Sequence, residues 1–366
     1  MKCLISSLAL GFVMLVVGCD TGGTQTASSG PTSTPDGTKQ AEQQQKKSSF
    51  KLAGSIYVGW MPWFLADEDG TLKQKAKQQG IEIEFIRGDY IETISQFAAG
   101  GADAVVLTNI DALTLLVKHN IETDVVLIGS YSNGNDAILM RDGEGGDIQG
   151  KTFGLVEFSV SHYLLDRYLE KNELPFDSVK WVNIDDSQIA GAFAAPGTEI
   201  AGVITWNPIA MQIEDKLEGN RIYDSSSLKN EIADLLVVKR SVASEHPELV
   251  KALLETWFDV AGRMKGNDRD ATLKELGRLS GTDGAAYARQ LESTILLDSP
   301  EAAENAIEAR HWATTMEEVL EFAERHEMLS NRDLTDCVSF GDGNKKVIHF
   351  DSSHLKQLVD VSATVP

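Results

Sequence analysis

Apolar runs alternate with amphipathic segments along the chain from Ser55 onward. The amphipathic segments have apolar residues at helical spacing, whereas the runs are short and continuous, as in buried strands. This pattern predicts strands at 55–60, 81–88, 104–109, 125–130 and 137–140. It predicts helices between them over 67–79, 91–99 and 111–119. Strands that alternate with helices are typical of βα units and a largely parallel sheet.

A Gly- and Asp-rich stretch after Met140 interrupts the pattern, and a second set of elements follows. Strands are predicted at 152–157, 179–184, 200–206 and 234–240, and helices over 161–171 and 187–194. The chain is then mainly helical, with helices predicted over 246–264, 270–279, 283–293 and 300–326. Two α/β units are therefore expected, and the strand at 234–240 indicates that the chain crosses back to the first unit. Residues 331–366 have too little periodicity to assign.

The first 49 residues differ from the rest. Lys2 precedes an apolar run that is too short to span a bilayer and is typical of a signal sequence over residues 1–19. The small residues before Cys19 resemble a bacterial lipoprotein box, which implies cleavage, acylation of Cys19 with palmitate or a similar chain, and a membrane anchor. An uncleaved anchor or an ordinary signal peptide is the alternative. Residues 20–49 hold almost no apolar side chains and predict a disordered tether.

Charge and cysteine content narrow the function classes. The chain of 366 residues has a formal net charge of −22 at pH 7, and because the charges of the tether cancel, the acidity belongs to the folded body. Such a surface argues against nucleic acid as a partner. Cys337 is the single cysteine after Cys19, so no internal disulfide is expected. The histidines are scattered without metal-ligand spacing, and we expect neither a metal nor a cofactor.

Polar and aromatic residues gather at the ends of the predicted strands, around the turn between Gly129 and Met140. The carboxyl ends of strands form the ligand-facing edge of an open α/β sheet. The candidate ligand-binding residues at these ends are Trp60, Trp63, Asp89, Tyr90, Asn109, Asp111, Asn135, Asp136, Glu157, Ser161, His162, Asp186 and Trp206. Most of them are acids, amides or aromatics.

Several segments together resemble a known family. They are GWMPW at 59–63, FAAGGADAVVLTNIDAL at 97–113, VEFSVSHYLL at 156–165, TWNP at 205–208 and DLLVVKRSVASEHPELVKALL at 234–254. With the lipoprotein signal, they resemble the substrate-binding proteins of ABC importers, in the family that takes nitrate, sulfonates, taurine and thiamine-pyrimidine precursors. Within that family the chain is similar to a urea- and guanidine-type subgroup.

The resemblance implies an α/β fold of the type II periplasmic-binding-protein kind, with two lobes, two crossover strands and a ligand cleft between the lobes. Lobe 1 would comprise residues 50–137 and 235–330, lobe 2 residues 138–234, and residues 331–366 would be a C-terminal extension. The implied partners are a membrane permease and its ATPase subunits. The family also implies a monomer held outside the cytoplasmic membrane.

The residue types at the strand ends favour a small planar solute rich in nitrogen. Carboxylates suit N–H donors, and the faces of Trp and Tyr attract cations. Guanidine ranks first, urea second and an aminomethylpyrimidine third. A sulfonate or nitrate would need cationic side chains, and Arg87 and His162 are the only basic residues near these ends. A ligand sensor or scaffold without transport is a further alternative.

Each candidate also has a plainer explanation. Trp60 and Trp63 could cap the core, and Asp111 and Ser161 precede helical runs, where a side-chain oxygen usually caps the backbone. Some relatives of this fold are pyrimidine synthases that consume their own histidine. Ser161 and His162 are adjacent and would point apart on a helix, and no G-x-S-x-G motif is present, so we do not expect an enzyme.

Overall fold

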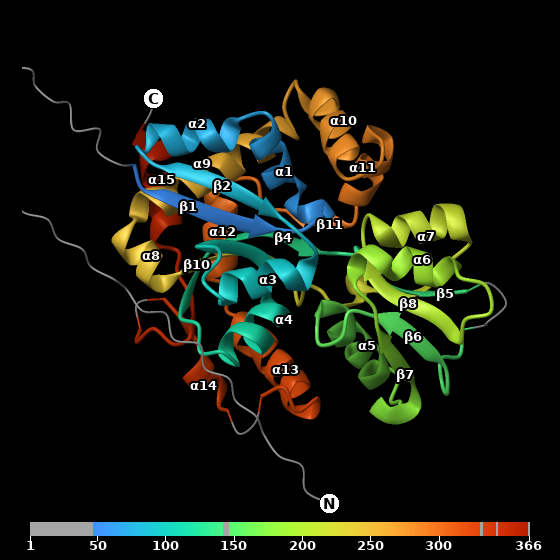
Figure 1. The fold of residues 1–366 in the computed structure, drawn as a ribbon. Coiled ribbons are helices and arrows are strands. Elements are labelled where there is room, and N and C mark those ends of the chain that lie inside the picture. The colour runs from blue at the N-terminus through green and yellow to red at the C-terminus, as the bar shows by residue number, and fades with distance from the viewer. Residues whose placement is uncertain (1–46, 142–145, 330–331, 342, 365–366) are drawn as a thin grey trace, which may run out of the picture. The chain divides into compact units, whose positions relative to one another are not determined.

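The computed structural model describes residues 47–141, 146–329, 332–341 and 343–364. Over these residues the chain forms two mixed sheets, each covered by helices (Figure 1). The predicted signal sequence, the lipid site at Cys19 and nearly all of the predicted tether lie outside the described residues. In the part of the chain that is described, no helix has the length and apolar character needed to cross a membrane.

The larger sheet has eight strands. Seven follow the order β12-β13-β4-β10-β3-β1-β2, and β11 pairs with β4. Their bounds are β1 Ser49–Gly54, β2 Glu82–Arg87, β3 Ala104–Thr108, β4 Thr123–Ser132, β10 Ala233–Lys239, β11 Thr294–Leu296, β12 Val338–Phe340 and β13 Ile348–Phe350. β1 is parallel to β2 and β3, whereas β10 runs antiparallel to β3 and β4. The chain therefore re-enters this sheet in the reverse direction.

The smaller sheet has five strands in the order β7-β6-β8-β5-β9. Their bounds are β5 Asp136–Met140, β6 Thr152–Leu155, β7 Lys180–Asn183, β8 Ile200–Trp206 and β9 Asn220–Asp224. β6 is parallel to β7 and β8, and β5 is antiparallel to β8 and β9. The chain leaves the larger sheet after β4 and returns to it at β10, so two crossings connect the sheets.

Fifteen α-helices are found in the described residues. They are α1 Met61–Glu68, α2 Thr71–Gln78, α3 Tyr90–Ala98, α4 Asn109–Asp111, α5 Val160–Lys171, α6 Ile189–Ala194, α7 Ile209–Leu217, α8 Arg240–Glu245, α9 Pro247–Arg263, α10 Arg269–Leu279, α11 Gly284–Leu291, α12 Pro300–Ile307, α13 Trp312–Arg325, α14 Leu334–Cys337 and α15 Ser353–Thr364. A π-helical segment, Ala112–Val117, continues α4. Short 3-10 turns lie at Val58–Trp60, Phe176–Ser178, Asp186–Gln188 and Ser225–Ser227.

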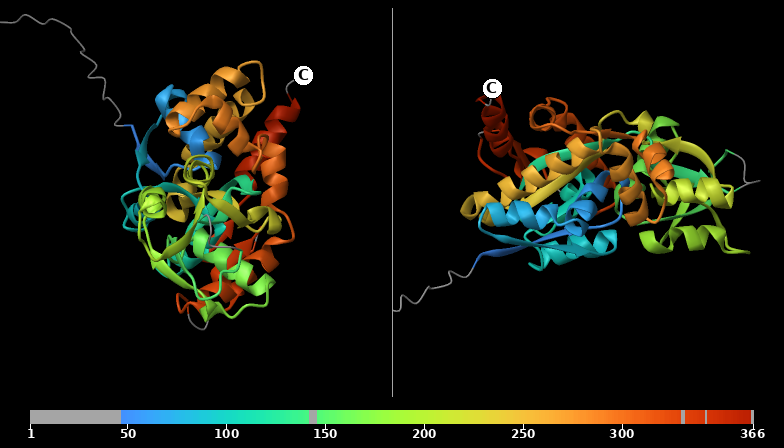
Figure 2. Two further views of the ribbon diagram at one scale, coloured as in Figure 1. Left: turned by 90° about the vertical axis from the view of Figure 1, so that its right-hand side faces the viewer. Right: turned by 90° about the horizontal axis from the view of Figure 1, so that it is seen from above.

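The two faces of the larger sheet are covered by different helices. Right-handed crossovers place α2 and α3 on opposite faces, because β2 and β3 lie on opposite sides of β1. Helix α9 lies beside α2, on the face of the sheet that α2 covers (Figure 2). Pro247 occupies the first turn of α9, where its missing N–H has no cost, and Leu253, Trp257 and Val260 bury one stripe of the helix.

Three sequence predictions differ from the structure. The strand predicted at 55–60 is wrong: β1 lies one segment earlier, and 58–60 form a 3-10 turn before α1. A short apolar run does not identify its own period, which explains the error. The helix predicted over 67–79 is interrupted at Gly70, whose φ of +83° favours glycine. The helix predicted over 300–326 is likewise two helices, α12 and α13.

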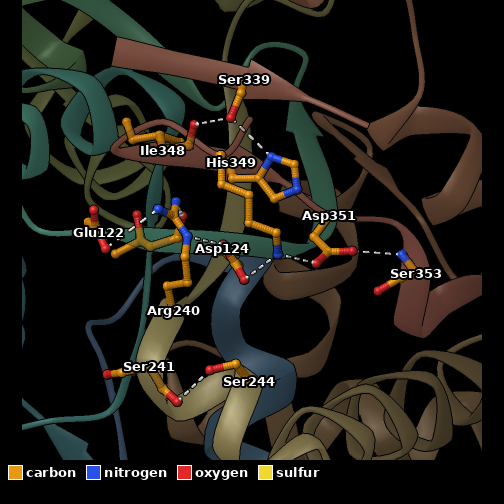
Figure 3. Close-up of polar contacts among 12 residues, drawn as sticks. Glu122, Asp124, Arg240, Ser241, Ser244, Ser339, Ile348, His349, Asp351 and Ser353 are labelled. Atoms are coloured by element: carbon orange, nitrogen blue, oxygen red, sulfur yellow. Dashed lines mark hydrogen bonds and ion pairs between the residues drawn. The ribbon is translucent and has the colours of Figure 1, made fainter. Parts of the chain in front are cut away.

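The C-terminal residues that the sequence left unassigned belong to the larger sheet. β13 pairs in parallel with the start of β4, and β12 adds a further strand. Buried Asp124 of β4 accepts hydrogen bonds from Arg240 Nε at 2.8 Å and from Lys345 Nζ at 3.1 Å (Figure 3). Lys345 also pairs with Asp351 at 3.1 Å, next to the start of α15. These hydrogen bonds and ion pairs stabilise the packing of β12 and β13 against the rest of the sheet.

Candidate functional site

Strand register brings polar residues from distant parts of the chain together. In the larger sheet, Asp234 of β10 lies opposite Thr108 of β3 and Ser130 of β4. Because β10 is antiparallel to both strands, its first residues meet their last residues. In the smaller sheet, Asp136 at the start of β5 lies opposite Trp206 at the end of β8. Asp136 and Asp234 thus lie where the two crossings enter their sheets.

A small cavity lies among these residues, with an empty volume of about 220 Å³. Its wall is formed by Tyr57, Trp60, Tyr90, Thr108, Asp136, Val160, Trp206 and Asp234. All of these residues are buried, and none is a lysine or an arginine. Only about 10 Å³ of this space can hold the centre of a water molecule, whereas ligand cavities usually measure about 300–1,000 Å³. The described state is therefore contracted, and even a compact solute would need the wall to move apart.

Two buried carboxylates of the wall are each bound by a serine. Asp136 Oδ2 accepts a hydrogen bond from Ser132 Oγ at 2.5 Å, and Asp234 accepts one from Ser130 Oγ. Burial raises the pKa of Asp136 to about 7, although the Ser132 hydrogen bond opposes the shift. Burial raises the pKa of Asp234 well above its usual range, and the charge of Asp136 adds to this effect. A positive charge in the cavity would favour the ionised form of both groups.

A third buried carboxylate, Asp111, lies behind Tyr90. Asp111 Oδ2 accepts hydrogen bonds from the Tyr90 hydroxyl at 2.6 Å and from Thr108 Oγ1 at 2.7 Å. Its second oxygen, Oδ1, is buried without a partner. Burial raises the pKa of Asp111 to about 6, against the effect of these two hydrogen bonds. Asp111 therefore orients the Tyr90 ring and adds negative charge near Asp136.

Four aromatic rings form a continuous series around the cavity. Tyr57 and Trp60 have ring centroids 4.9 Å apart, Trp60 and Tyr90 5.3 Å, and Tyr90 and Trp206 5.4 Å. The Trp206 ring belongs to the smaller sheet, whereas the other three belong to the part of the chain that precedes β4. Aromatic faces carry partial negative charge, so they reinforce the attraction of the carboxylates for a cation.

Further contacts join the two sheets at this place. The Tyr90 backbone N–H donates to Asp186 Oδ1 at 3.3 Å, and Ser187 Oγ donates to Asp89 Oδ2 at 3.1 Å. Burial raises the pKa of Asp186 to about 6. Asp89 itself is exposed and does not line the cavity. These two acids connect the lobes at the rim and make no part of the cavity wall.

Other predicted site residues lie away from the cavity wall. Trp63 packs against Trp257 with centroids 5.5 Å apart, in the core under the sheet. The Asn109 side chain binds the backbone of the second crossing, donating at 3.0 Å and accepting at 2.9 Å. Asn135 Nδ2 donates to Ser293 O at 2.7 Å. The two asparagines thus support the crossings, Trp63 belongs to the core, and none of the three lines the cavity.

Glu157 and His162 lie in a separate cluster between α5 and α13. Glu157 Oε1 accepts a hydrogen bond from Trp181 Nε1 at 3.0 Å. The buried His162 ring lies 4.5 Å from the Trp181 ring and 4.2 Å from the His326 ring, measured between centroids. Burial lowers the pKa of His162 to about 3, so its imidazole is neutral. His162 is therefore packed into a helix interface.

The N-cap explanation for Asp111 and Ser161 is wrong. Thr108 Oγ1 accepts from the Asp111 N–H at 3.3 Å and so caps α4. Ser159 Oγ accepts from the Ser161 N–H at 3.1 Å and caps α5. Ser161 Oγ is buried without a partner. Both caps are a few residues earlier than the sequence suggested.

Tyr57 and Asp234 line the cavity but were not among the predicted site residues. The prediction considered the carboxyl ends of strands, whereas Asp234 stands at the amino end of β10. The expected return crossing was the available signal, because an antiparallel strand presents its amino end at the edge where parallel strands present their carboxyl ends. Tyr57 was assigned to a strand that the structure does not contain.

A metal site is not apparent in the described residues. No group of three or more His, Cys, Asp or Glu side chains there is arranged to hold a metal ion. The three aspartates around the cavity are bound to hydroxyl groups instead. The arrangement can therefore hold a small solute by carboxylate and aromatic contacts.

Comparison with known proteins places these features in a family. Residues 77–259, half of the chain, match the NMT1/THI5-like family model. The taurine-binding periplasmic protein of Escherichia coli strain K12 is 25% identical over 231 residues, which cover 60% of this chain and 70% of that protein. Its name is that of a binding protein, in line with the expectation that this chain is not an enzyme.

Solved structures share the fold. The alkanesulfonate-binding protein of Xanthomonas axonopodis pv. citri, bound to MOPS, has a TM-score of 0.64 and 17% identity over 78% of this chain and 96% of its own. The periplasmic nitrate-binding protein of Synechocystis PCC 6803 has a TM-score of 0.64 and 11% identity over 88% of this chain and 90% of its own. These similarities confirm the predicted two-lobe α/β fold of periplasmic binding proteins.

Proposed function

The chain belongs to the NMT1/THI5-like family, and from this and from its two-lobe fold we propose that it is the solute-binding component of an ABC importer. Its solute is a small, planar, nitrogen-rich molecule, with guanidinium or a related amidinium first and urea second. The solute enters an open form, and closure of the lobes around it presents both lobes to a membrane permease and its ATPase subunits.

The observation that carries the choice of solute is the charge of the cavity. Asp136 and Asp234 line it, Asp111 lies behind Tyr90, and the wall contains no lysine or arginine. A buried carboxylate without a cationic partner is costly, and a bound cation would remove that cost. The series of aromatic rings would add cation–π attraction, which is strongest where water is excluded. A monovalent planar cation fits both features.

A taurine-like solute is the second candidate, because the Escherichia coli relative is named for taurine. Its ammonium group could bind the carboxylates, but its sulfonate would find no cation in the wall. The positive charge of Arg221 acts on Asp136, but this guanidinium is already bound to Glu214 and Asp224. A simple anion such as nitrate would face buried negative charge, so it fits this cavity least well.

The setting outside the cytoplasm is part of the same proposal. Periplasmic relatives and the fold support it, together with the signal-like and lipoprotein-like residues at the amino terminus. On this proposal Cys19 carries the lipid and residues 20–49 link it to the folded body. Palmitate labelling of the expressed protein, and its loss on Cys19→Ser, would test the anchor.

Calorimetric titration tests the solute. We expect guanidinium and methylguanidinium to bind the purified protein more tightly than urea, taurine or nitrate. We expect Asp136→Asn and Asp234→Asn each to weaken guanidinium binding by about 2–5 kcal/mol, the usual cost of breaking a buried charge pair. Asp177→Asn, which changes an exposed aspartate of the smaller lobe, is the matched control and should bind normally.

Two results would contradict this assignment. One is binding of taurine or nitrate without binding of any guanidinium compound. The protein would then still be a solute-binding protein, but its solute would not be a cation. The other is a loss of less than tenfold in guanidinium affinity in both cavity variants. Thermal unfolding of each variant serves as the folding control, since only the folded protein binds.

A further inference from the structure

Two hydrogen-bond donors in the cavity wall have no partner. They are the indole N–H groups of Trp60 and Trp206. These residues are only 4% and 2% exposed, respectively. Both line the same cavity. The wall thus contains unsatisfied donors as well as carboxylate acceptors.

Unpaired buried donors require an explanation, because a buried polar group without a partner costs free energy. An indole N–H can only donate, and it cannot rotate without moving its ring. The nearby carboxylates of Asp136 and Asp234 are already bound by the hydroxyls of Ser132 and Ser130. These carboxylates keep free lone pairs, but neither indole N–H is bound to one of them in the described state, so an acceptor in the cavity would give the indoles a partner.

The Tyr57 hydroxyl differs from the indoles, because it lies beside the carboxylate of Asp234. Burial, followed by the negative charges of Asp234 and Asp136, raises the pKa of Tyr57 well above its ordinary value. Tyr57 therefore stays protonated and remains a donor at any physiological pH. Its ring adjoins the Trp60 ring, so these two donors belong to one side of the aromatic series.

A solute that only donates hydrogen bonds can pair with the carboxylates of this wall but cannot pair with its indole N–H groups. Guanidinium carries N–H groups in its plane and no acceptor, so it would pair with the carboxylates and leave both indoles unpaired. We propose that the natural solute carries an acceptor oxygen beside its N–H groups, and that the indole N–H groups of Trp60 and Trp206 bind this oxygen. The inference rests on the proposed function and narrows its solute class.

The chemistry defines this class. It is an amidinium or guanidinium group joined over a few bonds to a carbonyl oxygen. The N–H groups would face Asp136 and Asp234, and the oxygen would face the indole N–H groups of Trp60 and Trp206, whose rings each adjoin the Tyr90 ring. Acylated guanidines fit the class, and urea has its carbonyl.

Two matched probes test the inference. Guanylurea and biguanide are planar molecules of the same size, and guanylurea has a carbonyl oxygen where biguanide has a nitrogen group. We expect the unmodified protein to bind guanylurea at least about tenfold more tightly, because a site built to bind a polar group rejects the analogue that lacks it. Calorimetric titration at one pH compares them.

Substitution of each tryptophan by phenylalanine removes the N–H and keeps an aromatic ring. We expect Trp60→Phe and Trp206→Phe each to weaken guanylurea binding about five- to thirtyfold and to change biguanide binding less than about threefold. Trp181→Phe is the control, because its N–H donates to Glu157 away from the cavity. Thermal unfolding shows whether each variant is folded.

A nuclear magnetic resonance measurement gives a second readout that does not depend on variant stability. We expect the indole N–H signals of Trp60 and Trp206 in the unmodified protein to move downfield with guanylurea and not with biguanide. The inference would be overturned if guanylurea and biguanide bound with equal affinity, or if the phenylalanine variants lost affinity for both probes equally. Either result would leave the proposal of cation binding intact. Failure of both cations to bind would overturn the proposed solute as well.

Discussion

Asp136 is a buried carboxylate of the cavity wall without a cationic partner. It is 3% exposed, it receives one hydrogen bond from Ser132, and the wall around it contains no cation. Burial therefore raises its pKa to about 7, compared with about 3.9 in an unfolded chain. The empty protein holds a proton there over a pH range in which the unfolded chain has lost it.

This difference predicts how Asp136→Asn changes stability with pH. The folded state binds more protons than the unfolded state between about pH 4 and 7, so the contribution of Asp136 to the unfolding free energy is greatest below pH 4 and falls as pH rises through 7. Asn does not titrate. We expect the empty variant to gain roughly 2–4 kcal/mol relative to the unmodified protein between pH 4 and 8.

Denaturant unfolding across this pH range measures the effect. Asp177→Asn, an exposed aspartate of the same lobe, should give a curve parallel to that of the unmodified protein. Parallel curves for Asp136→Asn as well would show that the cavity does not penalise this carboxylate. A saturating cationic solute should remove the difference at pH 8, because binding stabilises the ionised protein.

At the scale of elements, β4 connects the core to the first crossing. All ten of its residues are buried, and Trp257 of α9 packs over it. Gly129 makes this close contact possible, since a Cβ there would lie 2.8 Å from Trp257 Cζ2. The Trp257 indole is also fixed by its hydrogen bond to Leu297 O at 2.9 Å. Helix and strand are thus matched in shape.

This packing predicts opposite effects for two glycine substitutions. Gly129→Ala should destabilise the protein by about 1–3 kcal/mol, because the added methyl group displaces the fixed indole ring. Gly262→Ala, in the exposed part of α9 with open space around it, should be neutral or stabilise by up to about 1 kcal/mol. Chemical denaturation compares them. Equal effects would mean that the contact between Gly129 and Trp257 is not tight in solution.

Helix α13 shows a second role of packing between elements. Buried Asp166 of α5 pairs with Arg325 and with His326 Nε2, the latter at 3.1 Å. Arg167 of α5 pairs with Glu318 of α13. The smaller lobe is therefore held by α13 as well as by the two crossings, and His162 belongs to this interface.

At the scale of the whole molecule, the described state is closed. Trp206 is 2% exposed, and Tyr90 and Asp186 join the lobes at the rim of the cavity. On the proposed function a solute has to reach this buried cavity, so we expect an open state in exchange with this one. A solute shifts that exchange only by its preference for the closed state.

Small-angle scattering should detect this shift. We expect the radius of gyration of the empty protein to fall when a binding guanidinium compound is added, because the lobes close around it. Asp136→Asn should show no fall at the same concentration, since its binding is lost. An identical radius in both states of the unmodified protein would mean that the lobes do not move on binding.

Much of the local structure could be predicted from the sequence alone. The periodicity of apolar residues is a local property, so most strands and helices, including β5, β8 and α9, lie where they were expected. The prediction for segment 55–60 failed because an apolar run of only six positions fits both the strand and the helix period. The return strand β10 also followed from its run of apolar residues, and with it the existence of two lobes.

The site, too, could be predicted only in part from the sequence. The sequence by itself determined that acids, amides and aromatics would gather at strand ends, and that cations would be scarce there. It could not determine which of them meet, because Asp136 meets Trp206, and Asp234 meets Ser130, through the register between strands far apart in the chain. The segment after β1 adds Tyr57 to the same cavity. Burial, raised pKa values and unpaired indoles arise only from that meeting, so tertiary structure alone decided them.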